Sequence, residues 1–293
     1  MSLSVKIDTS FIVPLIRYLA EPSKELLTEI TNHTAAMKTH AHAIRFGNTK
    51  KSITSFWKAI LKQLSNNNNL IDYVKDSLTF IHNESGTFNE LLKDLWNYFP
   101  KDTNLRSTLY AILGYDIGIV SEGSALLNLG HKQFQEDQRE ILFMALHELH
   151  HVVYTAYNPI FDLTKINMTN QLCDVIRYCT HMEGLAVFST LEQRKSSKVL
   201  RNRDYQLFLD DKARNKRLSE FFDVLTDLEI RGAKPLHEND WKVLDRMSGR
   251  DRLWYVAGAH MAQMIETKFG RETLNETIRL GPDDFFKKYH ESF

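Results

Sequence analysis

Apolar residues recur at helical spacing along most of the chain, which is the pattern of amphipathic helices. Before residue 100 this spacing predicts helices over 23–46, 52–64, 70–81 and 88–99. After residue 136 it predicts helices over 137–156, 169–194, 203–230, 239–247, 252–269, 271–279 and 283–291. Residues 105–129 break the pattern, because glycines there separate short aliphatic and β-branched runs, and they predict a small hairpin or meander. We therefore expect a predominantly α-helical α+β fold with one small β-sheet.

This order of elements suggests a division near residue 104. We expect residues 1–104 to form an N-terminal helical region of unknown role, which could pack over a cleft, and residues 105–293 to form a catalytic region. Only twelve glycines and six prolines occur among 293 residues, and neither a repeat nor a linker rich in Ser, Pro or Gly separates the two regions.

Charge and cysteine content exclude several kinds of partner. Thirty-seven basic and thirty-seven acidic residues give a formal net charge of zero, so no overall field favours nucleic acid or an anionic membrane. The apolar stretches fall short of the roughly 18 residues that span a bilayer, and the N-terminus lacks a secretory pattern. The two cysteines, Cys173 and Cys179, cannot supply a disulfide framework. We expect a cytoplasmic protein whose function depends on a local site, and its oligomeric state stays open.

Residues 147–151 read His-Glu-Leu-His-His inside the predicted helix 137–156 and match the pattern H-E-x-x-H. A helix turns by about 100° per residue, so His147 and His151 lie about 40° apart on one face and can bind the same zinc ion. Glu148 flanks that face and can take a proton from a zinc-activated water without being a ligand. The surrounding residues are apolar, and burying these polar groups without a metal would be costly. The pattern therefore predicts a zinc site.

A third protein ligand is needed to complete such a site. The longer pattern H-E-x-x-H-x-x-G-x-x-H is excluded, because Tyr154 and Tyr157 stand where it needs glycine and histidine. Glu183 is the best candidate, since a carboxylate followed by Gly-Leu-Ala-Val-Phe on an apolar helix has few other roles. His181 and Asp174 stay open as replacement ligands.

These two segments together resemble the gluzincin-type metallopeptidases, in which H-E-x-x-H is followed by a ligand glutamate on a later helix. Within that clan the chain looks most like the uncharacterised zinc-dependent peptidases, over about residues 105–290. The resemblance implies a small β-sheet followed by a gluzincin-like active-site helix bundle. It also implies that His147, His151 and Glu183 bind zinc and that Glu148 is the general base. The chain departs from thermolysin-like members at Val187, where they have an aspartate that orients a ligand histidine.

Peptide hydrolysis also needs a group that stabilises the oxyanion of the intermediate. Tyr255, by likeness to a late-helix tyrosine of the clan, and His260 are the candidates. Their separation of five residues places them on different faces of one helix, so we expect only one of them to face the metal. The predicted strand at Ser124–Asn128 could pair with an extended substrate backbone.

The sequence thus predicts a zinc metallopeptidase, a hydrolase that cleaves a peptide or protein substrate by means of a zinc-activated water and Glu148. Two alternatives stay open. One is a non-catalytic binding or regulatory protein that keeps the zinc scaffold, and the other is a zinc hydrolase of a non-peptide amide.

Overall fold

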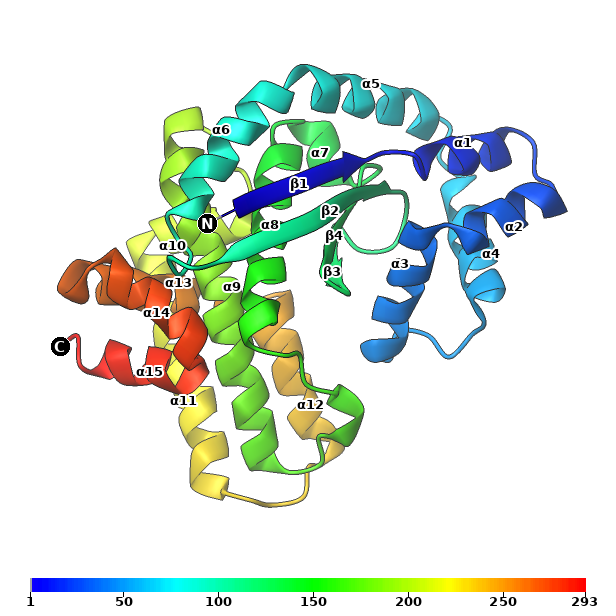
Figure 1. The fold of residues 1–293 in the computed structure, drawn as a ribbon. Helices are drawn as coiled ribbons and strands as arrows, with labels where there is room; N and C mark the ends of the chain where they lie inside the picture. The colour runs from blue at the N-terminus through cyan, green and yellow to red at the C-terminus, as the bar shows by residue number, and fades with distance from the viewer. Residues whose placement is uncertain (1) are drawn as a thin grey trace. The chain divides into compact units, whose positions relative to one another are not determined.

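The computed structural model describes residues 2–293 (Figure 1). The chain divides into two compact units, of which one comprises Met1–Lys93 and Thr103–Val152 and the other comprises Asp94–Asp102 and Val153–Phe293. The expected division into an N-terminal helical region (1–104) and a catalytic region (105–293) concerns the roles of the two regions, and it stays a prediction. Within residues 2–293 helices dominate both units, and one small sheet belongs to the first of them, as the predicted α+β fold requires.

The sheet has four strands in the order β1-β2-β4-β3. The strands are β1 (Ser2–Asp8), β2 (Asn104–Ile112), β3 (Gly118–Ser121) and β4 (Ser124–Asn128). β3 and β4 form the predicted hairpin, whose two-residue turn has positive φ at both Glu122 (48°) and Gly123 (69°), as a type I′ turn requires. The sequence pattern missed β1, which pairs in parallel with β2 about 100 residues later in the chain.

Six helices precede β2 and two follow β4 before residue 158. They are α1 (Ile12–Ala20), α2 (Lys24–Asn32), α3 (Thr34–Arg45), α4 (Ile53–Leu64), α5 (Leu70–Asn83), α6 (Ser85–Trp96), α7 (Lys132–Glu136) and α8 (Glu140–Tyr157). The prediction of one continuous helix over 23–46 is wrong. The chain leaves the helix at His33, whose backbone is extended and whose imidazole accepts a hydrogen bond from the Ala35 backbone N–H, so α3 begins anew.

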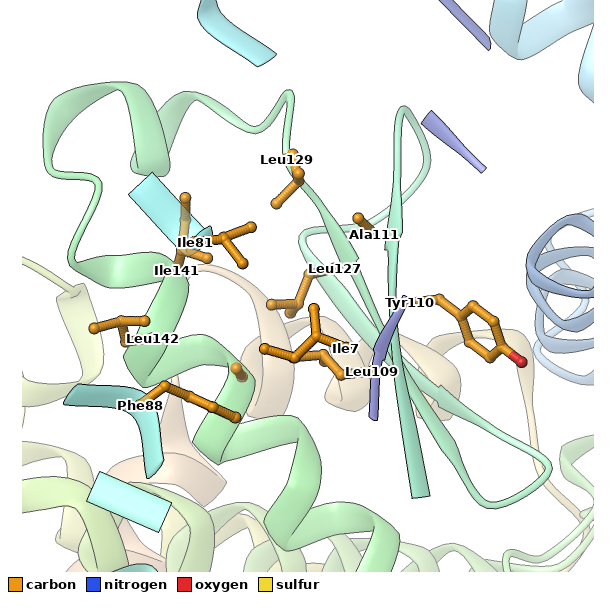
Figure 2. Close-up of a pocket in the computed structure, with 11 residues that line it drawn as sticks. Ile7, Ile81, Phe88, Leu109, Tyr110, Ala111, Leu127, Leu129, Ile141 and Leu142 are labelled. Atoms are coloured by element: carbon orange, nitrogen blue, oxygen red, sulfur yellow. The ribbon is translucent and has the colours of Figure 1, made fainter. Parts of the chain in front are cut away.

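One face of the sheet forms a hydrophobic core with helices of the same unit. Figure 2 shows a small apolar cavity in this core, which side chains of β1, β2, β4, α5, α6 and α8 line. Leu109 faces the cavity whereas its neighbour Tyr110 points away, which is the alternation of a strand. The first turns of α8, at Ile141 and Leu142, are therefore anchored in this core, and the segment that carries His147 and His151 follows them on the same helix.

Hydrogen bonds connect α3 and the residues after it to the chain on both sides of β3. At one end Lys38 donates hydrogen bonds to the backbone oxygen (3.0 Å) and carboxylate (3.3 Å) of Glu122. At the other end the Tyr115 hydroxyl bonds to His42 Nδ1 (3.1 Å) and accepts from the Asn48 side-chain amide (2.9 Å). Both anchor points, Tyr115 (φ 67°) and Glu122 (φ 48°), have left-handed backbone.

Residues beyond 158 are mainly helical. A short 3₁₀ turn (Leu163–Lys165) precedes α9 (Thr169–Ser197), α10 (Arg203–Leu209), α11 (Asp211–Arg231), α12 (Glu238–Leu244), a short π-helix (Asp245–Gly249), α13 (Leu253–Phe269), α14 (Arg271–Leu280) and α15 (Pro282–His290). The predicted helix over 203–230 is in fact two helices, because Asp210 is extended and its carboxylate caps α11 at the Ala213 backbone N–H. No helix within residues 2–293 combines the length and apolarity that crossing a membrane requires.

Helices α9 and α13 cross at two glycines. A Cβ placed on Gly258 would lie 2.0 Å from the Thr180 backbone oxygen and 2.7 Å from the Gly184 Cα. A Cβ on Gly184 would lie 2.3 Å from Gly258 Cα. The two backbones therefore touch without intervening side chains at the residue that follows Glu183, which fixes Glu183 relative to α13.

Candidate metal centre

Helix α8 presents two histidines from consecutive turns. The ring centroids of His147 and His151 are 4.5 Å apart and their planes meet at 78°. His151 is buried and His147 is partly exposed, so one side of the pair is open to solvent. This geometry follows from the i, i+4 spacing on a helix.

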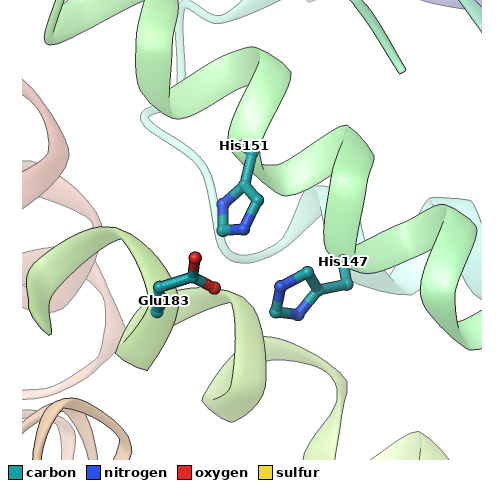
Figure 3. A group of neighbouring side chains, drawn as sticks. All are labelled: His147, His151 and Glu183. Carbon is teal, nitrogen blue, oxygen red and sulfur yellow. The ribbon is translucent and has the colours of Figure 1, made fainter. Parts of the chain in front are cut away.

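Glu183 of α9 completes a three-residue group with these histidines. Each of the three residues offers one ligand atom, and these atoms all lie within 4.8 Å of one another. Figure 3 shows the Glu183 carboxylate and the two imidazoles pointing toward one another. The structure thus brings together the three residues that the sequence analysis proposes as zinc ligands.

The chemistry of this donor set fits zinc. Zinc prefers nitrogen and oxygen or sulfur ligands in tetrahedral geometry, and its catalytic sites use three protein ligands and leave the fourth position open. Two imidazoles and one carboxylate supply such a set. Calcium and magnesium instead prefer sites made of oxygen ligands, which this group does not provide.

Glu148 lies on the same helix with its side chain against β3. It is 5% exposed, and a Cβ built on Gly118 would lie 2.5 Å from Glu148 Oε1 and 2.8 Å from Glu148 Cδ. Only a residue without a side chain leaves room for this carboxylate. Sequence reasoning missed Gly118, although a glycine inside a strand is a signal for close approach of another group.

Tyr255 lies on α13 close enough to Glu183 for their charges to interact. Burial, followed by the negative charge of Glu183, raises the pKa of the Tyr255 phenol well above its ordinary value. A phenol is protonated at neutral pH even at its ordinary pKa of about 10, so Tyr255 can donate a hydrogen bond. The guanidinium carbon of Arg252 lies 3.4 Å from the centre of the Tyr255 ring.

His260 has other neighbours. Its ring centroid is 6.2 Å from that of Tyr289, and burial together with the charge of Arg214 lowers its pKa. The five-residue separation thus gives Tyr255 and His260 different surroundings, as two faces of one helix should. Of these two candidates, Tyr255 is the one whose surroundings include Glu183.

The two replacement ligands lie apart from this group. His181 is fully buried, and both of its ring nitrogens are engaged, Nδ1 with the Tyr154 hydroxyl and Nε2 with Thr277 Oγ1, each at 3.0 Å. Burial lowers its pKa to about 3. Asp174 is exposed, and its pKa is raised by partial burial and by Asp283. Neither side chain belongs to the group of potential ligands found among residues 2–293.

The expectation that the strand at Ser124–Asn128 pairs with a substrate is wrong. This strand is β4, which lies inside the sheet, parallel to β2 on one side and antiparallel to β3 on the other. Its backbone hydrogen-bonding groups are therefore used by its neighbours. β3, the strand that contacts Glu148, is the one at the edge of the sheet on this side.

Comparison with known protein families finds a match over most of the chain. The model of a protein family described as "Putative zinc dependent peptidase (DUF5700)" matches residues 24–293. The match includes the H-E-x-x-H segment, Glu183 and α13. No curated protein and no solved structure matches the chain.

Proposed function

Because the chain belongs to the DUF5700 family, whose description is putative zinc-dependent peptidase, we propose that it is a zinc metallopeptidase whose active site is the His147, His151 and Glu183 group. The single observation that carries the proposal is this group of potential ligands, which two helices bring within 4.8 Å. Glu148, a buried carboxylate on the helix that carries the two histidines, adds the proton acceptor that hydrolysis needs.

His147, His151 and Glu183 would hold the zinc ion through two nitrogens and one oxygen. The ion would supply Lewis-acid chemistry, lowering the pKa of a water molecule and polarising the scissile carbonyl. Glu148 accepts a proton from the attacking water and passes it to the amine that leaves when the C–N bond breaks. Its seat against Gly118 limits the positions that the carboxylate can occupy.

Tyr255 is the proposed donor to the oxyanion. A phenol, with an ordinary pKa of about 10, carries its proton at neutral pH and can donate it in a hydrogen bond as negative charge develops on the substrate oxygen. His260 is the weaker candidate, because its neighbours are Arg214 and Tyr289 rather than the proposed zinc ligands.

Elemental analysis of the purified protein tests the metal site, with wild type, E183A and E148Q measured in parallel. We expect about one zinc per chain in wild type and E148Q, and much less in E183A, because of the two substituted residues only Glu183 is a proposed ligand. Wild-type protein that stays free of zinc after zinc is supplied would overturn the proposal.

Hydrolysis of a peptide library by the same three proteins tests the reaction. We expect E148Q to lose about 10²–10⁴-fold in kcat while it keeps zinc, because it lacks the general base. Zinc-loaded wild type that cleaves no peptide but does cleave simple amides would favour a non-peptide amide hydrolase. If it cleaves neither, the alternative of a non-catalytic zinc-scaffold protein takes the place of the peptidase.

A further inference from the structure

Arg252, the residue that precedes α13, has an unusual backbone. Its φ of 55° and ψ of 36° lie in the left-handed region, which side-chain-bearing residues rarely adopt. Such a conformation persists only where surrounding contacts fix it, and it occurs often at functional sites. The short π-helix at Asp245–Gly249 ends a few residues earlier, and single turns of π-helix are also frequent at functional sites.

The Arg252 guanidinium joins three segments of one unit. It forms a two-pronged ion pair with Asp204 of α10, through Nε to Oδ1 at 2.5 Å and Nη2 to Oδ2 at 2.6 Å. Its Nη1 donates to the Ser248 backbone oxygen in the π-helix at 2.6 Å. The guanidinium carbon also lies over the ring of Tyr255, one turn into α13, at 3.4 Å from the ring centre. Asp204 is buried, so this pair is shielded from solvent.

We propose that the Asp204–Arg252 pair is a positioning device that orients the Tyr255 phenol for the reaction at the proposed zinc site. This inference rests on the peptidase function proposed above. Arg252 acts through Tyr255 and need not touch the substrate, because its donors are directed to Asp204 and the Ser248 backbone.

The geometry of Arg252 favours a role in orienting the Tyr255 ring over a role in which it only supplies a positive charge to balance Asp204. A guanidinium that is fixed at two carboxylate oxygens has a defined plane, and a ring stacked on that plane loses freedom of rotation. A lysine would keep the charge but could form neither the two-pronged pair nor the flat stack. R252K therefore separates the two roles.

The chain contains a matched control pair. Arg231 and Asp240 also form a two-pronged ion pair, with distances of 2.6 and 2.8 Å. The side chains are similarly exposed, 26% and 11% in this pair against 24% and 6% for Arg252 and Asp204. R231K therefore makes the same chemical change at a pair that the proposal assigns no role in the reaction.

The kinetic test compares R252K, R231K, Y255F and the double variant R252K/Y255F, each loaded with zinc. We expect R252K to lower kcat by about tenfold or more with KM changed less than about threefold, and R231K to leave both within about twofold. R252K should cause no further loss in the Y255F background, because the residue through which it acts is already altered. An equal loss in both backgrounds, or equal losses in R252K and R231K, would overturn the proposal.

A second readout depends on neither zinc nor turnover. 3-Fluorotyrosine placed at position 255 should give one narrow ¹⁹F resonance in the metal-free protein. We expect R252K and D204N to shift or broaden this resonance, and R231K to leave it unchanged. An unaltered resonance in both R252K and D204N would contradict the proposal even if R252K folded poorly. If wild type proves inactive on peptides, the peptidase function fails, whereas the resonance still shows whether Arg252 fixes Tyr255.

Discussion

The carboxylate of Glu148 occupies the space that a side chain at Gly118 would need. A Cβ at position 118 would lie 2.5 Å from Glu148 Oε1, well inside contact distance. The proposed general base is therefore seated by a strand, β3, that lies 30 residues before it in the chain. This relationship makes the position of one carboxylate testable by a change at another residue.

We expect G118A to lower kcat for peptide hydrolysis by at least about tenfold, because the added methyl group displaces the Glu148 carboxylate. The clash is with the end of a flexible side chain, so the protein should still fold and bind about one zinc per chain. Kinetic assays and elemental analysis measure the two effects.

Gly86 provides the control for this change. A Cβ on Gly86 meets nothing within 4 Å, and G86A should leave kcat unchanged. If G118A had full activity, Glu148 would not depend on the space at Gly118.

The crossing of α9 and α13 should not tolerate a methyl group. In G258A the new Cβ would meet the Thr180 backbone oxygen at 2.0 Å, and a backbone atom cannot move aside as a side-chain end can. We expect a loss of about 3 kcal/mol in the free energy of unfolding, measured by urea denaturation. G249A, at a glycine with open space around it, should change this free energy by less than about 0.5 kcal/mol. Equal stability of both variants would show that the helices separate without cost.

The free energy of unfolding should decrease as the pH is lowered, because of His42. Burial, and to a lesser extent the charge of Arg45, lowers its pKa to about 4, compared with about 6.5 in an unfolded chain. Between these values the unfolded state binds more protons, so the stabilisation is fully present above pH 6.5 and is lost as the pH falls toward 4. Its size is up to about 3 kcal/mol.

The variant H42Q isolates this effect. We expect the free energy of unfolding of H42Q to depend less steeply on pH between 4 and 6.5 than that of wild type. Other groups contribute to both proteins, including His181, whose pKa is about 3. H82Q is the matched control, because it removes an imidazole from an exposed position. Parallel curves for wild type and H42Q would refute the prediction.

His181 should act in stability rather than in metal binding. Y154F removes the hydroxyl that contacts His181 Nδ1 and leaves a buried nitrogen without its partner. We expect a loss of about 1–3 kcal/mol in the free energy of unfolding, with zinc content unchanged. Denaturation and elemental analysis on the same preparation check both parts. Loss of zinc in Y154F would make His181 a group of the metal site.

Much of the fold could be predicted from the sequence, because most of its helices have local causes. The helix at 52–64 is found as α4, and the segment carrying His147 and His151 is found as α8. β1 could not be predicted in the same way. Its partner β2 lies about 100 residues away, and parallel pairing leaves no turn signal between the two strands. The helix breaks at His33 and Asp210 did have a local signal, since both side chains cap the following helix.

The candidate site, too, contains residues that the local sequence predicts and residues that it does not. His147 and His151 follow from helical spacing, and Glu183 from the cost of an unexplained carboxylate among apolar residues. Arg252 and Asp204 could not be found this way, because 48 residues separate the two halves of their ion pair. No local pattern marks a contact that only the packing of helices creates.

The pairing of β1 with β2 also sets an order of events during synthesis. Ser2 aligns with Asn104, so the first strand leaves the ribosome about 100 residues before its partner exists. At about 5–20 residues per second, that interval lasts about 5–20 s. Helices α1 to α6 can form meanwhile, but the sheet against which Glu148 is seated cannot close. Until then β1 is a strand without a partner, open to association with other chains.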